Sequence, residues 1–273
     1  MEAVARAPRR PSPLRHFFYV TAALTVTEFR LRYFGSVLGY FWSLLRPLML
    51  FGILYTVFTQ VFRFGGGVPH YAVMLLMGIV LWSFFADSTG GALPSFVQRE
   101  SLLRKMSFPR AAIPIAVSLT AAANLALGLL VVLVLAIVDN VAITASWLLL
   151  LPIVSGLIAL AAALSVLLAV LFVRYRDVQP VWDVAQQFLF WATPIIYTIE
   201  FAPQRVRHLM MLNPLAVAVQ QVRHSLIDPT TPSAAQAIGG SGRLLIPLAI
   251  FLGVIGLSAL VYRRSAGGLA EDL

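Results

Sequence analysis

The sequence predicts an all-α polytopic membrane protein, with six transmembrane helices preceded by one amphipathic helix. Two observations lead to this fold class. About 60% of the 273 residues are hydrophobic, and they gather into six long apolar runs separated by shorter polar segments. Each run has about 20 residues or more, which is the length that a helix needs to cross about 30 Å of hydrocarbon.

The predicted elements follow these runs in order. The six spans are placed at residues 40–62, 71–96, 113–138, 147–173, 181–199 and 244–262. With their loops they form one transmembrane domain at residues 34–264. Residues 1–13 and 265–273 are predicted to be terminal tails.

A surface helix is predicted ahead of the first span, at residues 14–33. Phe17, Val20 and Leu24 recur there at helical spacing among charged residues, a pattern typical of a helix that lies in the membrane interface. A plain leader into the first span is the alternative.

Basic residues predict the orientation of the spans, because loops rich in arginine and lysine are retained in the cytoplasm. With the N-terminus inside, 15 of the 20 basic residues fall on cytoplasmic segments. The five on the outer side are Arg63, Arg205, Arg207, Arg223 and Arg243. Both termini are therefore expected in the cytoplasm. The net charge of +9 needs no nucleic-acid partner, because the excess faces anionic membrane lipid.

Composition argues against several kinds of site. The chain has no cysteine, which excludes disulfides, thiolate metal sites and cysteine nucleophiles. Its four histidines are scattered and form no closely spaced metal-binding pair. The single lysine, Lys105, is not part of a Gly-rich phosphate-binding loop, so the chain is not a P-loop ATPase. We expect no catalytic residue, metal or cofactor in this chain.

Two loops are predicted to carry short helices. Residues 99–108, on the cytoplasmic side, mix apolar and charged side chains, which indicates an amphipathic helix that docks onto a cytoplasmic partner. A helix that only rests on lipid headgroups is the alternative. On the outer side, residues 203–228 are divided by prolines and predict short helices at the outer mouth.

Three ordered segments resemble one family of transporters. They are RLRYFGSVLGYFWSLLRPL at 30–48, LLRKMSFPR at 102–110 with Pro114, and RYRDV at 174–178 followed by TPIIY at 193–197; Asn213, Pro214 and Arg223 complete the series. The set resembles the ABC-2-type permeases that export polysaccharides such as O-antigen, teichoic acid and galactan. The resemblance covers about residues 14–264. It implies a type V exporter-like fold and a homodimer in the bacterial inner (plasma) membrane. It also implies two copies of a separate P-loop ATPase, which binds ATP and magnesium.

The resemblance assigns residues 99–108 to the coupling helix of the family. An apolar wedge of this helix enters a groove of the ATPase, and neighbouring charges fix its register. The matching residues are Arg99, Glu100, Leu102, Leu103, Arg104, Lys105, Met106 and Phe108.

The family's substrates are glycans carried on polyprenyl pyrophosphate, and arginine pairs well with phosphate oxygens. Arg30, Arg32 and Arg46 lie near the cytoplasmic mouth and are the candidates to receive the pyrophosphate. Ordinary positive-inside anchoring is the alternative for Arg30 and Arg32. Arg46 lies inside the first span, where an unpaired charge costs about 3 kcal/mol, so we expect it to have a partner or a water-filled route.

Two carboxylates are candidate partners for these arginines. Asp87 and Asp183 fall near the cytoplasmic ends of the second and fifth spans. We expect them to pair with Arg46, Arg174 or Arg176, and a proton relay is the alternative.

A glycan path is expected to be aromatic with few fixed charges, because the apolar C–H faces of sugars pack on aromatic rings. The candidates are Trp42, Tyr55, Phe58, Trp82, Phe85, Trp191 and Tyr197. A role in the interfacial belt or in helix packing is the alternative for each.

The sequence thus predicts the membrane subunit of an ABC exporter that moves lipid-linked polysaccharide outward and performs no bond chemistry itself. One alternative is an ABC-2 permease for a small-molecule drug or lipid. Another is a membrane-embedded glycosyltransferase or flippase that works without an ATPase. The cytoplasmic loops lack the paired carboxylates typical of a transferase site.

Overall fold

The computed structural model describes residues 12–33, 39–63, 67–101, 109–142 and 144–265, and the regular structure of these residues is entirely helical. Among them, five helical segments are long and apolar enough to cross a membrane. They are α2 (Gly39–Thr56) with its π-helical extension η1 (Val57–Val61), α3 (Tyr71–Ala92), α6 (Ala112–Val138), α7 (Leu150–Arg174) with the preceding turn η3 (Ala145–Leu149), and α12 (Leu245–Ser265) with η6 (Ser241–Leu244). The predicted all-α membrane class is confirmed.

The predicted fifth span, residues 181–199, is shorter in the structure. Helix α8 (Val178–Ala192) has 15 residues, and its apolar run continues as an irregular segment with Thr193 in an extended conformation. Pro194 is the physical reason, because a proline disfavours helical backbone at the residue before it. Leu93 and Pro94 follow the end of α3, and the short helix α4 (Ser95–Gln98) comes after them.

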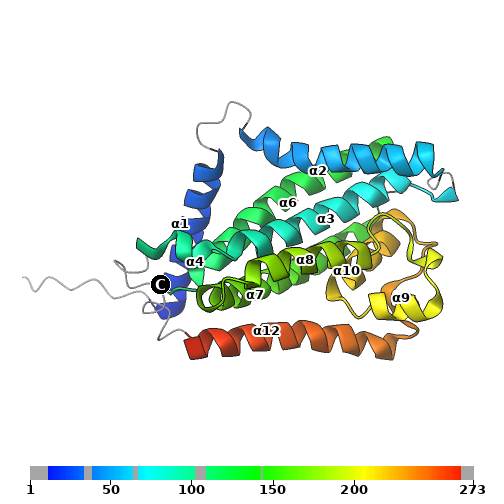
Figure 1. Ribbon diagram of the computed structural model, residues 1–273. Coiled ribbons are helices and arrows are strands. Elements are labelled where there is room, and N and C mark those ends of the chain that lie inside the picture. Colours follow the sequence, from blue (N-terminus) through cyan, green and yellow to red (C-terminus); the bar gives the residue numbers. More distant parts are fainter. Residues whose placement is uncertain (1–11, 34–38, 64–66, 102–108, 143, 266–273) are drawn as a thin grey trace, which may run out of the picture.

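Apart from α8, the helices that are not spans occupy the two ends of the bundle (Figure 1). Helix α1 (Pro13–Tyr33) covers the residues of the predicted surface helix and lies at the same end as α4. At the other end are η4 (Ile199–Phe201), α9 (Gln204–Met210), α10 (Pro214–Val222), η5 (Arg223–Ile227) and α11 (Ala234–Ile238).

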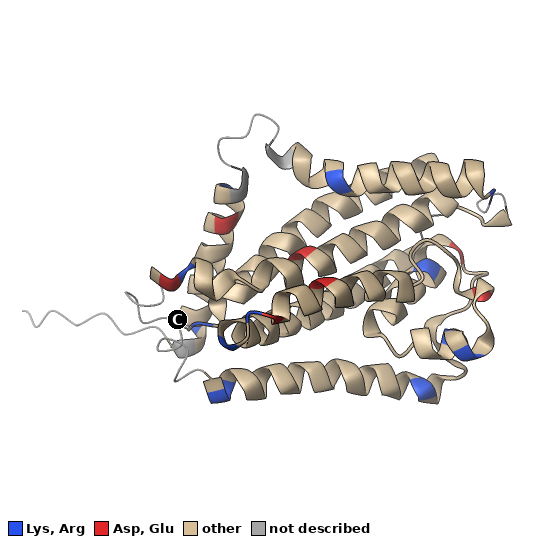
Figure 2. Cartoon of the chain, in the orientation of Figure 1, with Lys and Arg blue, Asp and Glu red and all other residues tan. Residues whose placement is uncertain are grey.

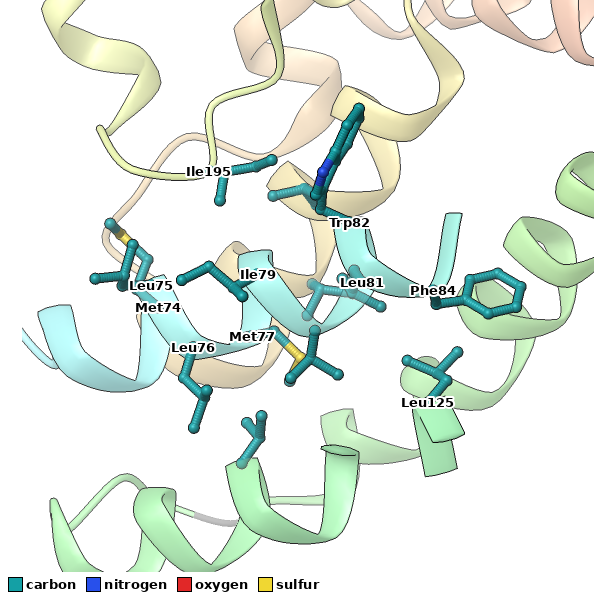
Figure 3. Close-up of a cluster of buried hydrophobic side chains, with 14 of the residues drawn as sticks. Met74, Leu75, Leu76, Met77, Ile79, Leu81, Trp82, Phe84, Leu125 and Ile195 are labelled. Atoms are coloured by element: carbon teal, nitrogen blue, oxygen red, sulfur yellow. The ribbon is translucent and has the colours of Figure 1, made fainter. Parts of the chain in front are cut away.

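Helix α3 is the centre of the bundle. Its side chains are buried on every face, and Figure 3 shows them reaching both α6 and the segment that carries Ile195. The packing against α6 is close at Gly128, where an added Cβ would lie 2.7 Å from the Val80 Cγ1. Small residues permit such close approach of helices in membranes, and a larger side chain at Gly128 would push α6 away from α3.

A hydroxyl network joins three of the buried helices. Ser118 of α6 donates to the Ser165 Oγ at 3.0 Å, and Ser165 of α7 donates to the Ser88 carbonyl of α3 at 3.1 Å. All three serines are fully buried. Hydrogen bonds of this kind hold helices together where lipid supplies no hydrophobic driving force.

Helices α2 and α8 lie on the flanks of this centre. Neither has a buried residue in its described span, whereas most of α3 is buried. Helix α2 is held mainly by α3, whereas α8 contacts both α3 and α7.

Substituting Ser165→Ala should lower stability by about 1 kcal/mol, because it removes the shared hydroxyl with little change of volume. We expect the melting temperature of the purified protein to fall by about 2 to 4 °C. Ser155→Ala on the same helix is the matched control, because the exposed Ser155 hydroxyl only donates to its own helix at the Leu151 carbonyl. Equal shifts in the two variants would contradict the role of the network.

Candidate functional site: the α2–α3 cavity

A cavity of about 540 Å³ opens between α2, α3, α6 and α8, and we refer to it as the α2–α3 cavity. Its polar lining residues are Ser43, Arg46, Ser83, Asp87, Asn124 and Gln186. Two tryptophans, Trp42 and Trp82, also line it. The cavity therefore combines charged, amide and aromatic groups within a membrane bundle.

Helix α2 contributes one tryptophan and one arginine to the cavity. Trp42 and Arg46 are four residues apart, which places them on the same face of the helix. The Arg46 Nη1 lies 4.0 Å from the Asp87 Oδ1 of α3, so the expected pairing with Asp87 is present but loose. The Arg46 side chain is 87% exposed, and its guanidinium can still donate to an anion that enters the cavity.

Helix α8 closes one side of the cavity because polar contacts dock it onto α3. The Gln186 Nε2 donates to the Ala86 carbonyl at 3.2 Å and to the Thr89 Oγ1 at 3.1 Å. The Trp182 Nε1 donates to the same hydroxyl at 3.3 Å. Asp183, also on α8, is exposed. Figure 2 shows how few charged residues interrupt these helices.

The predicted aromatic residues do not share one surface. Trp42 and Trp82 line the α2–α3 cavity, while Phe85 is buried with its ring centroid 5.9 Å from that of Trp82. Tyr55 stacks against Tyr71 with the ring centroids 6.2 Å apart, and Phe58 lies beside Phe62. Trp191 and Tyr197 line a separate apolar groove. The structure thus brings two of the seven together with Arg46.

The predicted coupling residues belong to the connection between α3 and α6. Arg99 forms an ion pair with Glu28 of α1, and Glu100 is half-buried. Leu102, Leu103, Arg104, Lys105, Met106 and Phe108 lie outside the described residues. Arg30 is exposed on α1 and is not among the residues that line the cavity, and the Arg32 side chain also lies outside the description.

Both flanks of residues 102–108 are anchored on one apolar cluster. Phe96 before the segment and Ile113 after it are fully buried together, with Leu24 of α1 packed against them. The Ala111 N–H donates to the Tyr262 hydroxyl of α12 at 3.1 Å. Helices α1 and α12 therefore both pack against the cluster that contains the residues flanking the predicted coupling segment.

A buried arginine organises the irregular segment after α8, and sequence reasoning gave it no site role. Arg223 is 2% exposed and donates from Nη2 to the Pro194 carbonyl at 2.7 Å and from Nη1 to the Tyr197 carbonyl at 3.2 Å. Burial lowers the pKa of Arg223 to about 10, because desolvation disfavours its charged form, so it stays charged at neutral pH. Its guanidinium donates to the backbone carbonyls of Pro194 and Tyr197, which would have been paired within the helix if α8 had continued.

The Glu28–Arg99 pair should contribute about 1 kcal/mol of coupling free energy, since both side chains are less than one-quarter exposed. Glu28→Arg and Arg99→Glu should each lower the melting temperature of the purified protein, and the exchanged double variant should recover most of the loss. Arg15→Glu, at an exposed position of α1, is the control for reversing a charge on that helix. Additive losses in the double variant would show that the two residues do not interact.

Comparison with known proteins places this architecture in a family. The family model of the ABC-2 type transporter matches residues 19–227. This range contains the α2–α3 cavity, the Glu28–Arg99 pair and Arg223.

Curated relatives agree with that match. An O-antigen export system permease protein RfbA of Klebsiella pneumoniae is 27% identical over 218 residues, which cover 80% of this chain and 83% of that protein. A protein of the same name from Myxococcus xanthus is 28% identical over 214 residues, which cover 78% and 82%. With the family match spanning most of its length, the chain belongs to the ABC-2 type transporter family.

Proposed function

We propose that the chain is the membrane subunit of an ATP-driven exporter that moves polyprenyl-pyrophosphate-linked polysaccharide outward across the bacterial inner membrane. The observation that carries the proposal is the α2–α3 cavity, where Arg46 lies beside Trp42 and Trp82. The similarity to proteins named as O-antigen export permeases supports the same substrate class.

The cavity suits a ligand with two different parts. A pyrophosphate needs directed donors, and Arg46 presents an exposed guanidinium that Asp87 holds only loosely. The first sugar needs an aromatic face and polar groups, which the exposed Trp42, Asn124 and the amide oxygen of Gln186 would supply. A small apolar drug would need little of this polar lining, so the cavity favours the glycan over the alternative substrates.

The energy for transport is assigned to a separate ATPase. The single lysine of this chain is not in a phosphate-binding loop, and ABC-2 permeases work with ABC ATPase subunits. We infer a complex of two copies of this chain with two ATPase copies. Residues 99–108 would contact the ATPase, and the anchoring of both flanks of this segment to α1, α6 and α12 supports that role.

Replacing Arg46 should impair export more than it impairs folding. In vesicles that contain this chain and its ATPase, Arg46→Gln should lower ATP-dependent export of lipid-linked polysaccharide by about tenfold, equivalent to roughly 1.4 kcal/mol of lost binding. Trp42→Ala should act in the same direction. ATP hydrolysis without substrate should change little, because neither residue belongs to the predicted coupling segment.

Arg63→Gln is the matched control for this prediction. Arg63 is an exposed arginine just after the same helix but is not among the residues that line the cavity. Equal export by the Arg46→Gln and Arg63→Gln variants would show that the substrate does not use the α2–α3 cavity. An absence of ATP-dependent polysaccharide export in the unaltered protein would overturn the proposed function itself.

A further inference from the structure

A second hollow, at the end of the bundle away from α1, is unlike the α2–α3 cavity in its chemistry. It has a volume of about 580 Å³ and runs between α8, α9 and α12. Phe188 and Trp191 of α8, Leu209 of α9 and Ile250 of α12 line it, and all four are at least 40% exposed. Most of its other lining residues are also apolar. We call it the outer groove.

Basic residues lie at one end of the outer groove. Arg205 and His208 of α9 share a helix face with each other, and Arg205 shares one with the lining residue Leu209. The Arg243 Nη1 donates to the His208 Nδ1 at 3.4 Å and so brings a second arginine to the rim. Figure 2 shows basic residues on α9 and beside the start of α12 at this end of the bundle.

Among the residues that the structure describes, Arg205, Arg207 and Arg243 form no ion pair with a carboxylate. Arg207 of α9 points back to its own loop and donates to the carbonyls of Glu200 and Ala202. Glu200 is the acidic residue nearest to Arg205 and Arg207 in the sequence. The three arginines are also among the five basic residues assigned to the outer side, where basic residues are otherwise sparse. The positive charge of the rim therefore suits the binding of an anion.

The distance between the basic residues at the rim and the apolar residues that line the outer groove fits a lipid. Arg243 lies just before α12, and Ile250 lies five residues after the start of that helix, about 7.5 Å along its axis at about 1.5 Å per residue. This separation corresponds to the depth between a phosphate headgroup and the upper part of an acyl chain. A soluble anion would use the basic rim but would leave the apolar lining without a partner.

The geometry points to a binding site for an anionic phospholipid, with one acyl chain in the outer groove and the phosphate on Arg205 and Arg243. Arg207 is held by its own loop, and His208 positions Arg243. Trp191 lies in the wall of the groove, where it would contact the acyl chain. The site is independent of the proposed polysaccharide substrate.

Quenching of tryptophan fluorescence by brominated lipid tests this site directly, because bromine quenches only at contact. The full chain is placed in vesicles containing phosphatidylglycerol or phosphatidylcholine with the same brominated acyl chains. The difference between the unaltered protein and Trp191→Phe isolates the signal of Trp191 from the other four tryptophans. Trp191 is 60% exposed, so the phenylalanine variant should fold normally.

Brominated phosphatidylglycerol should quench Trp191 at about fivefold lower mole fraction than brominated phosphatidylcholine, as expected for a favourable arginine–lipid contact. The double variant Arg205→Gln with Arg243→Gln should abolish this preference. Arg63→Gln, which removes an exposed positive charge just after η1, should preserve it.

Two outcomes would overturn the proposal. Equal quenching by the two lipids would mean that the groove meets only ordinary surrounding lipid. Absence of Trp191 quenching by both would mean that protein, such as a second copy of the chain, covers the groove. Because the assay uses neither ATP nor glycan, both outcomes would leave the proposed export function standing.

Discussion

The close packing of α3 against α6 and α7 is the constraint on which the rest of the structure depends. In hydrocarbon, helices gain little from hiding apolar surface, so their association needs tight contact and internal hydrogen bonds. Gly128 provides the contact with Val80, and the serines at 88, 118 and 165 provide the hydrogen bonds. With α3 fixed, α2 and α8 can attach to it from the flanks.

This division between a rigid centre and attached flanks produces the candidate site. Helix α2 has no buried residue in its described span, yet it carries Trp42 and Arg46 toward α3. Helix α8 is held by Gln186 and Trp182 and closes the cavity from the other side. The cavity thus lies between two peripheral helices and the buried helices α3 and α6.

The sequence predicted the fold class and most span positions, since apolar runs of membrane length leave few alternatives. It did not predict the end of α8. Residues 193–199 are still mostly apolar, although their backbone is no longer α-helical and their carbonyls need other donors. Arg223, about 30 residues later, satisfies two of these carbonyls, and such a long-range partner has no local signal. Helix α11 was also not predicted, although Ser233 and Gln236 carry a capping-box pattern that could have revealed it.

The candidate site was predictable only as separate residues. Trp42 and Arg46 share a face by simple helical spacing, and the charge of Arg46 inside a span already demanded a partner. Which aromatic residues would join it depended on how α2, α3 and α8 cross. Trp82 therefore lies in the same cavity, whereas Trp191 and Tyr197 lie in the outer groove.

The most direct test of the central claim is to deplete this protein in its own host and to determine which side of the membrane holds the lipid-linked polysaccharide. Sugar labelling, extraction of polyprenyl-linked glycan and an assay of its sidedness would give the answer. The account predicts that long lipid-linked polymer accumulates on the cytoplasmic side when the protein is depleted. An unchanged distribution of the polymer would contradict it and would favour a small-molecule substrate.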